Sequence, residues 1–136
     1  MLIMAILIKK PNEEYYAIIN DNIEIKEGEY KEYYNDILKV LCYYTNNKLN
    51  GKYIIFNYDK TINKVSNYNN GILEGEEIQY YDHFDKRSMR KSYYNNGKLH
   101  GKSKLYNGDG KLEWSIIYDN GEIKRPYKKH NKCIIM

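Results

Sequence analysis

Apolar and polar residues alternate with a period of two over much of the chain, and short polar turns interrupt this alternation at regular intervals. In the segment 111–118 every second position is apolar, namely Leu112, Trp114, Ile116 and Tyr118. Because successive side chains of a β-strand point to opposite faces, this pattern predicts a strand with one apolar face. No segment shows a helical period, so the chain is expected to fold as an antiparallel meander of strands.

Aromatic residues mark a repeat of about one strand and one turn. They recur at Tyr44, Phe56, Tyr68, Tyr80, Tyr94, Tyr106 and Tyr118, twelve residues apart except for one step of fourteen. We attribute the longer step to the stretch 82–89, where two extra residues are expected to lengthen one loop. A repeat of this kind decides the fold, and here it predicts an all-β, elongated meander of repeated β-hairpins.

The repeat carries two glycines with different expected roles. The first follows asparagine in a two-residue turn, where positive φ angles are needed, at Gly71, Gly97 and Gly121. The pair Asn46-Asn47 retains half of this signal. The second glycine lies inside a strand, at Gly51, Gly75 and Gly101. Glycine weakens a strand unless the space is needed, so we expect a neighbouring aromatic ring to lie over each of these.

The repeat motif does not extend to the beginning of the chain. Residues 5–8 (AILI) and 15–19 (YYAII), separated by KKPNEE, predict a hairpin that caps the repeats. A weak copy, without an Asn-Gly turn, begins near residue 26. The sequence thus divides into an N-terminal capping hairpin (1–25), the repeats (26–123) and a basic tail (124–136).

The segments YTNNKLNGKYIIF (44–56), YNNGILEGEEIQY (68–80), YNNGKLHGKSKLY (94–106) and YDNGEIK (118–124) align with one another. This pattern resembles MORN-type repeats, and more closely the variant repeat of bacterial YwqK-like proteins, a group described as antitoxins. The resemblance covers residues 26–124 and implies a single sheet of stacked hairpins used as a scaffold or binding surface, without a catalytic centre or cofactor. The chain has only Trp114 where MORN units usually each carry a tryptophan, so the lipid-binding role of that family transfers weakly.

Charge and composition narrow the class of partner. The chain has 136 residues, 17 of them tyrosine, and a net charge of +4. Residues 124–136 hold five cations and no acid, so residues 1–123 carry a net charge of −1. Nucleic-acid binding is not expected, because the cations before residue 124 are matched almost one for one by carboxylates. Instead, the tyrosines favour a protein partner, and the widely separated Cys42 and Cys133 indicate a reducing compartment.

No residue pattern predicts catalysis, a metal or a cofactor. The histidines His83, His100 and His130 lack partners at metal-ligand spacing, and no Ser-centred nucleophile motif occurs. His100 is expected to be a solvated strand residue. The carboxylate pairs at 13–14 and 76–77 are expected to be solubility charges, and Cys42 a packed apolar residue.

The last four residues, Cys133-Ile134-Ile135-Met136, fit the C-a-a-X prenylation pattern with a terminal residue that favours farnesyl transfer. One lipid chain binds a membrane only marginally, and a basic patch can supply the second signal. We therefore expect prenylation at Cys133 and attraction to an anionic membrane surface by Lys124, Arg125, Lys128, Lys129 and Lys132. In a host without a prenyltransferase, Cys133 would be an ordinary thiol.

These features together predict a non-enzymatic, MORN-like protein-binding or scaffold module in the cytoplasm, attached to the cytoplasmic face of a membrane if it is farnesylated. The alternative is a soluble YwqK-like antitoxin or immunity protein that neutralises a toxin by direct binding.

Overall fold

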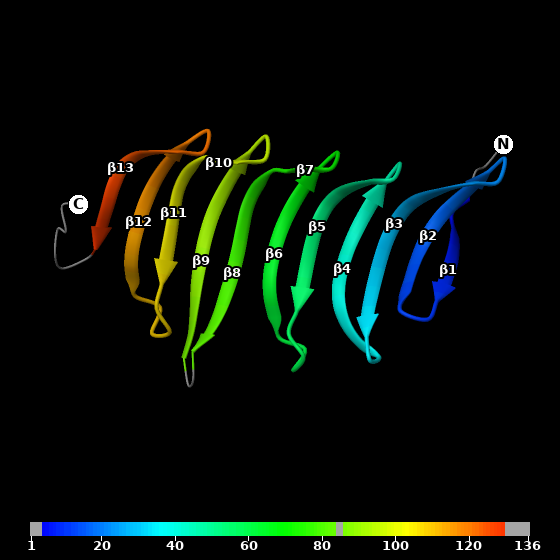
Figure 1. Ribbon diagram of the computed structural model, residues 1–136, viewed down its shortest axis with the longest axis horizontal. Coiled ribbons are helices and arrows are strands. Elements are labelled where there is room, and N and C mark those ends of the chain that lie inside the picture. The colour runs from blue at the N-terminus through cyan, green and yellow to red at the C-terminus, as the bar shows by residue number, and fades with distance from the viewer. Residues whose placement is uncertain (1–3, 84–85, 130–136) are drawn as a thin grey trace. The chain divides into compact units, whose positions relative to one another are not determined.

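The computed structural model describes residues 4–83 and 86–129 and contains thirteen β-strands (Figure 1). Neighbouring strands are paired antiparallel, and the described residues form no helix. The predicted all-β meander of hairpins is therefore confirmed. Contacts divide the chain into two units, residues 1–72 and 73–136, and we describe each by itself.

The first unit, residues 1–72, is an antiparallel sheet in which each strand pairs with the one before it. Its strands are β1 (Ile6–Lys10), β2 (Glu13–Asn20), β3 (Ile23–Tyr34), β4 (Ile37–Thr45), β5 (Lys48–Phe56) and β6 (Ile62–Asn69). The short strand β7 (Ile72–Leu73) spans the boundary between the units. β1 and β2 form the hairpin predicted within residues 1–25, and β2 continues into the sheet by pairing with β3.

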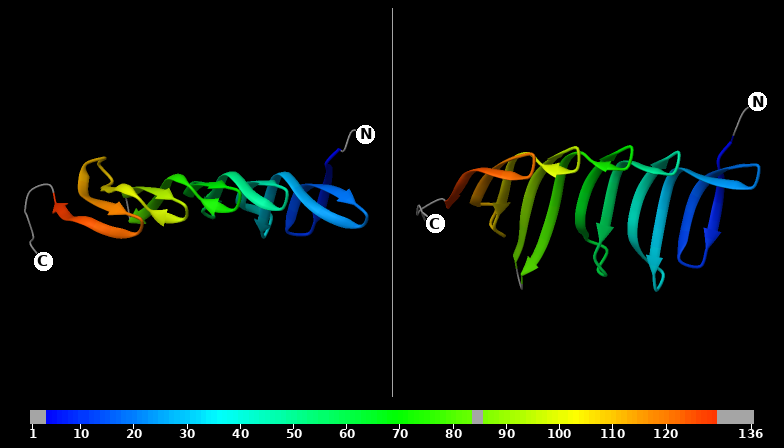
Figure 2. Two further views of the ribbon diagram at one scale, coloured as in Figure 1. Left: turned by 90° about the horizontal axis from the view of Figure 1, so that it is seen from above. Right: turned by 45° about the horizontal axis from the view of Figure 1, so that its top comes forward.

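The second unit, residues 73–136, follows the same order along the chain. Its strands are β8 (Gly75–His83), β9 (Lys86–Asn95), β10 (Lys98–Leu99), β11 (Gly101–Tyr106), β12 (Leu112–Asp119) and β13 (Glu122–Lys129). β10 and β11 both pair with β9 because the chain bends between them. Figure 2 shows this change of direction, after which the chain enters the next long strand.

The hairpin turns have the backbone that the sequence predicted. Asn70 and Gly71 have φ angles of 48° and 83°, and Asn120 and Gly121 have 50° and 92°. Positive φ at both central residues is what a two-residue turn between twisted strands requires. Pairs without glycine, Asp21-Asn22, Asn35-Asp36 and Asn46-Asn47, adopt the same region. The turn at 21–22 precedes the weak first copy, which begins near residue 26, and it has no Asn-Gly pair.

The strand glycines are explained by conformation rather than by a covering ring. Gly75 and Gly101 have φ angles of 82° and 77°, and a Cβ atom built on either would meet nothing within 4 Å. The expected aromatic cover is thus wrong at these two positions. At Gly51 the nearest atom to such a Cβ is the Cβ of Tyr43, at 3.8 Å, and φ is 108°. Glycine is needed because it adopts positive φ without steric cost, which lets each strand bend.

The fourteen-residue step also has a different cause from the one predicted. β8 and β9 remain paired through Tyr81–Ser88, Asp82–Arg87 and His83–Lys86. The extra residues therefore lengthen the two strands, whereas the prediction placed them in a longer loop. Residues 84 and 85, between these two strands, lie outside the described residues.

Successive turns are joined by a ladder of backbone hydrogen bonds. The N–H of Gly71 donates to the carbonyl of Leu49 at 2.7 Å. In the second unit, the N–H groups of Gly97 and Gly121 donate to Leu73 and Leu99 at 2.9 and 2.8 Å. Each turn is thus held to the equivalent leucine of the preceding repeat.

A second ladder uses the side chain that precedes each strand glycine. The backbone N–H of the first turn residue donates to the corresponding side chain of the previous copy. We call the position of this accepting residue, directly before the strand glycine, the acceptor slot. The pairs are Asn46 to Glu27 (2.8 Å), Asn70 to Asn50 (3.3 Å), Asn96 to Glu74 (2.7 Å) and Asn120 to His100 (3.5 Å). The residue in the slot varies, but all four side chains carry a hydrogen-bond acceptor. His100 is exposed, as predicted, yet its role is to contact the next turn.

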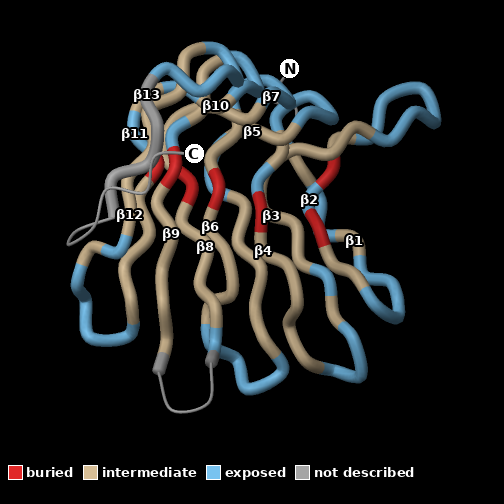
Figure 3. Tube along the Cα trace, turned by 60° about the vertical axis from the view of Figure 1, so that its left-hand side comes forward, coloured by how far each residue is buried: buried red, intermediate tan, exposed pale blue. Residues whose placement is uncertain are grey.

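Burial is confined to short stretches of the strands (Figure 3). In the first unit a row of facing residues runs through Tyr15, Tyr30, Cys42, Tyr53 and Ser66. We call this side the Tyr15 face. In the second unit the buried row contains Glu77, Ser92 and Ser103, and the two serine hydroxyls are hydrogen-bonded at 2.7 Å.

Candidate functional site

Few apolar side chains of the described residues are fully buried. Among the described residues, the buried apolar ones are Tyr15, Ala17 and Cys42. Twelve large apolar side chains are exposed: Met4, Ile6, Leu7, Tyr16, Ile19, Ile23, Tyr34, Tyr43, Tyr58, Ile72, Tyr93 and Ile123. Apart from Met4 and Tyr58, which lie outside the strands, these residues have a backbone that is held by strand pairing, so their side chains are presented on a defined frame.

A cluster of three tyrosines surrounds one lysine on the Tyr15 face. The Lys26 ammonium lies 4.8, 4.6 and 5.3 Å from the ring centroids of Tyr15, Tyr30 and Tyr44. The rings also contact each other, with centroid distances of 5.8 Å for Tyr15–Tyr30 and 5.7 Å for Tyr30–Tyr44. All three distances to the ammonium are within the range of cation–π attraction. We refer to the three rings as the tyrosine cage.

Two carboxylates hold the cage in place. The Tyr30 hydroxyl donates to Glu13 at 2.8 Å, and the Tyr15 hydroxyl donates to Glu24. Burial, followed by these hydrogen bonds, raises the pKa of both phenols. The Tyr30 hydrogen bond in turn lowers the pKa of Glu13. The rings are therefore neutral phenols, held by carboxylates at the edge of the cage.

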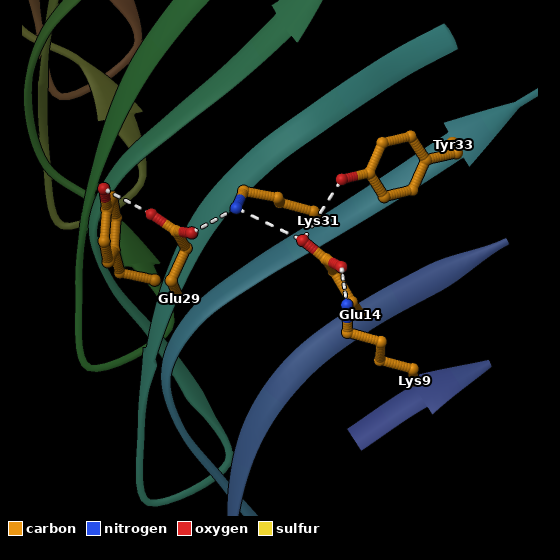
Figure 4. A network of polar contacts seen from close by, with 6 residues as sticks. Lys9, Glu14, Glu29, Lys31 and Tyr33 are labelled. Carbon is orange, nitrogen blue, oxygen red and sulfur yellow. Dashed lines mark hydrogen bonds and ion pairs between the residues drawn. The ribbon is translucent and has the colours of Figure 1, made fainter. Parts of the chain in front are cut away.

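The opposite side of the same strands, the Glu14 face, carries a network of alternating charges (Figure 4). Glu14 is 3.7 Å from the ammonium of Lys9 and 3.2 Å from that of Lys31, which is 2.7 Å from Glu29. The Tyr33 hydroxyl also donates to Glu14, and these contacts lower the pKa of the Glu14 carboxyl. The network is balanced in charge, so it orders the surface without creating a strong field.

Beside this network lies an exposed apolar patch formed by Leu7, Tyr16 and Tyr43. Tyr43 donates to Glu29 at 3.3 Å, which connects the patch to the charges. Leu7 and Tyr16 face each other across β1 and β2 and line a shallow cavity of about 190 Å³. Apolar anchors bordered by ordered polar groups are the composition expected of a protein-binding surface.

The second unit has a groove of about 250 Å³ lined by Tyr81, Ser88, Arg90, Leu105 and Trp114. At one side of it, Arg90 is 3.9 Å from the carboxylate of Glu77, whose side chain is 4% exposed. The expectation that the pair at 76–77 are solubility charges is wrong for Glu77, because this carboxylate is buried and ion-paired. Burial, together with Glu77, raises the pKa of the Tyr94 phenol.

Among the residues that the structure describes, no group of three or more histidine, cysteine or acidic side chains could hold a metal ion. Cys42 is 1% exposed, and burial raises the pKa of its thiol to about 11. It is thus packed as the sequence predicted, and its protonated form is a poor nucleophile.

The predicted membrane-binding residues fall at or beyond the end of the described chain. Lys124 forms an ion pair with Asp119 at 3.1 Å, and Arg125, Lys128 and Lys129 belong to β13. Lys132 and the prenylation candidate Cys133 lie outside the described residues, so the membrane predictions stay predictions. Within the described ranges no helix has the length and apolar character to cross a membrane.

The sequence did not indicate the tyrosine cage or the burial of Glu77. Lys26 lies in the weak first copy, and its three rings come from β2, β3 and β4, so no local spacing connects them. The burial of Glu77 follows from the pairing of β8 with β9, because Glu77 lies opposite the buried Ser92 and on the same face of the sheet.

Neither a protein-family model nor a curated protein matches the chain. The resemblance to MORN-type repeats therefore stays a prediction that rests on the repeated motif.

Proposed function

We propose that this protein is a non-enzymatic, MORN-like repeat module that binds a protein partner through the Leu7–Tyr16–Tyr43 patch of the Glu14 face. The observation that supports the proposal most directly is the exposure of these three side chains, at 45%, 41% and 38%. A solvent-facing cluster of this kind costs solubility unless a partner covers it. The adjacent Lys9–Glu14–Lys31–Glu29 network supplies a polar border.

Site-specific photo-crosslinking in native cells tests this proposal. A benzophenone amino acid replacing Tyr43 should give a discrete crosslinked protein, and the same group replacing the exposed Lys52 of the neighbouring strand should not. The double variant Tyr16→Ala/Leu7→Ala should reduce co-purification of that protein at least tenfold, with an unchanged circular dichroism spectrum. Equal crosslinking from both positions, or a partner retained by the double variant, would refute the assignment of the patch.

A further inference from the structure

The ammonium of Lys26 is held in an unusual way for a surface lysine. Among the described residues, its ammonium contacts three aromatic rings and has no carboxylate within ion-pair distance. Lys9, Lys10 and Lys31 on neighbouring strands all pair with glutamates. The cage therefore selects a cation by the faces of its rings, an interaction worth roughly 0.5–2 kcal/mol depending on desolvation.

The cage is built from the sheet rather than from flexible loops. Its rings come from three adjacent strands, Tyr15 is 1% exposed, and Glu13 and Glu24 fix two of the hydroxyls. Lys26 is only half-buried, and its side chain is the flexible component of the cluster. An outward rotation of Lys26 would uncover the three rings, with Glu13 and Glu24 beside them. The Lys10 ammonium, which pairs with Glu13, would remain 5.1 Å from the centroid of the Tyr15 ring.

We propose that the tyrosine cage is a binding site for a lysine side chain of a protein chain, and that Lys26 fills this site until the incoming lysine displaces it. The geometry already displayed is that of a bound lysine, with its ammonium 4.6–5.3 Å from each ring. This site lies on the face opposite the Leu7–Tyr16–Tyr43 patch and goes beyond the function proposed above. The two can therefore fail independently.

Lys26 acts as an intramolecular competitor in this arrangement. If it occupies the cage about nine-tenths of the time, the apparent affinity for another lysine is reduced roughly tenfold. Removing the Lys26 ammonium should therefore raise the apparent affinity for the incoming lysine by the same factor. The direction of this effect is diagnostic, because loss of a purely structural lysine would leave lysine binding unchanged or weaker.

The test is a titration of the full-length protein with acetyl-Gly-Lys-Gly-amide, followed by the NMR shifts of the tyrosine ring protons at constant ionic strength. Lys26→Ala and Lys26→Gln should both bind the peptide about tenfold more tightly than the wild type does. The matched peptide with norleucine in place of lysine should not bind. Tetramethylammonium serves as a second probe and distinguishes a peptide lysine from a free small cation.

Ring substitutions separate cation recognition from folding. In the Lys26→Ala background, Tyr44→Phe should retain binding and Tyr44→trifluorophenylalanine should lose it, because fluorine withdraws charge from a ring of the same shape. Tyr68→Leu is the control and should leave binding unchanged. The ring centroids of Tyr53 and Tyr68 are 5.8 Å apart, as are those of Tyr15 and Tyr30, but neither Tyr53 nor Tyr68 is among the rings that Lys26 contacts. Equal peptide affinity of the wild type and both Lys26 variants would overturn the proposal. Equal binding by the phenylalanine and fluorinated variants would also overturn it. The same holds if tetramethylammonium binds and the lysine peptide does not.

Discussion

At the scale of single residues, backbone conformation explains more of this structure than side-chain volume does. The strand glycines Gly75 and Gly101 adopt positive φ with open space where a side chain would project. Glycine therefore recurs at this position of the repeat because the bend in the strand requires it. The same reasoning applies to the turn asparagines, which tolerate this region better than other non-glycine residues.

Gly101→Ala should lower the free energy of unfolding by about 1 kcal/mol, because a left-handed backbone is costly for any residue with a Cβ. Since nothing lies within 4 Å of the added methyl group, this cost is conformational and not steric. Urea denaturation measures it, with Gly108→Ala as the control, because Gly108 is not among the described glycines with positive φ. Equal stabilities of the two variants would contradict this account of the bend.

The Cys42 thiol should react slowly with an alkylating reagent at pH 7.5 in the folded protein. Burial raises its pKa to about 11, so very little thiolate is present, and the sulfur is shielded from the reagent. Alkylation of a Cys133→Ser variant, followed by mass spectrometry with and without denaturant, tests this. Similar rates in both conditions would show that Cys42 is accessible.

At the scale of elements, the repeat is defined by hydrogen bonds between copies as much as by the hairpins themselves. Each acceptor slot receives an N–H from the following turn, and the slot residues are Glu27, Asn50, Glu74 and His100. In the final copy, 118–124, the corresponding residue is Lys124, whose side chain can only donate.

Glu74→Ala should cost about 0.5–1.5 kcal/mol of stability, since the Asn96 N–H loses its side-chain acceptor at 2.7 Å. Glu74→Gln keeps a carbonyl oxygen at the same position and should cost less. Thermal or urea unfolding of the two variants provides the comparison. If glutamine is as destabilising as alanine, the negative charge rather than the hydrogen bond matters.

The sequence predicted the hairpins and turns because their signals are local. Alternation and Asn-Gly pairs act within a dozen residues, and the structure places Asn70-Gly71 and Asn120-Gly121 as expected. The acceptor slot was not predicted, because glutamate, asparagine and histidine appear unrelated until each is seen beside the next turn. The tyrosine cage was missed for a similar reason, as its rings meet only after three strands have paired.

At the scale of the whole molecule, the many partly buried phenols link stability to pH. Burial is the largest cause of the raised pKa of Tyr15, Tyr30, Tyr44, Tyr53 and Tyr94. The pKa of the Cys42 thiol shifts in the same direction, from 9.0 to about 11. Ionisation is thus easier in the unfolded chain, which releases more protons at alkaline pH.

Stability should therefore be constant up to about pH 8 and fall as the pH rises toward 11, by more than about 1 kcal/mol. Below the unfolded-state pKa values, the neutral thiol and phenols are retained in both states and the full stability is present. Urea midpoints at pH 7.5 and 10.5 give the difference, and Cys42→Ala should reduce it. A midpoint that rises over this interval would show that the buried rows are not the groups that titrate.

The pairing of most strands with the long strand just before them also bears on how the protein is made. In each unit the connections are short turns, several of only two residues, so little chain entropy is lost in closing each hairpin. Folds dominated by such local pairing form rapidly. A nascent chain leaving the ribosome can add one strand at a time to the hairpins already formed, without waiting for a distant segment.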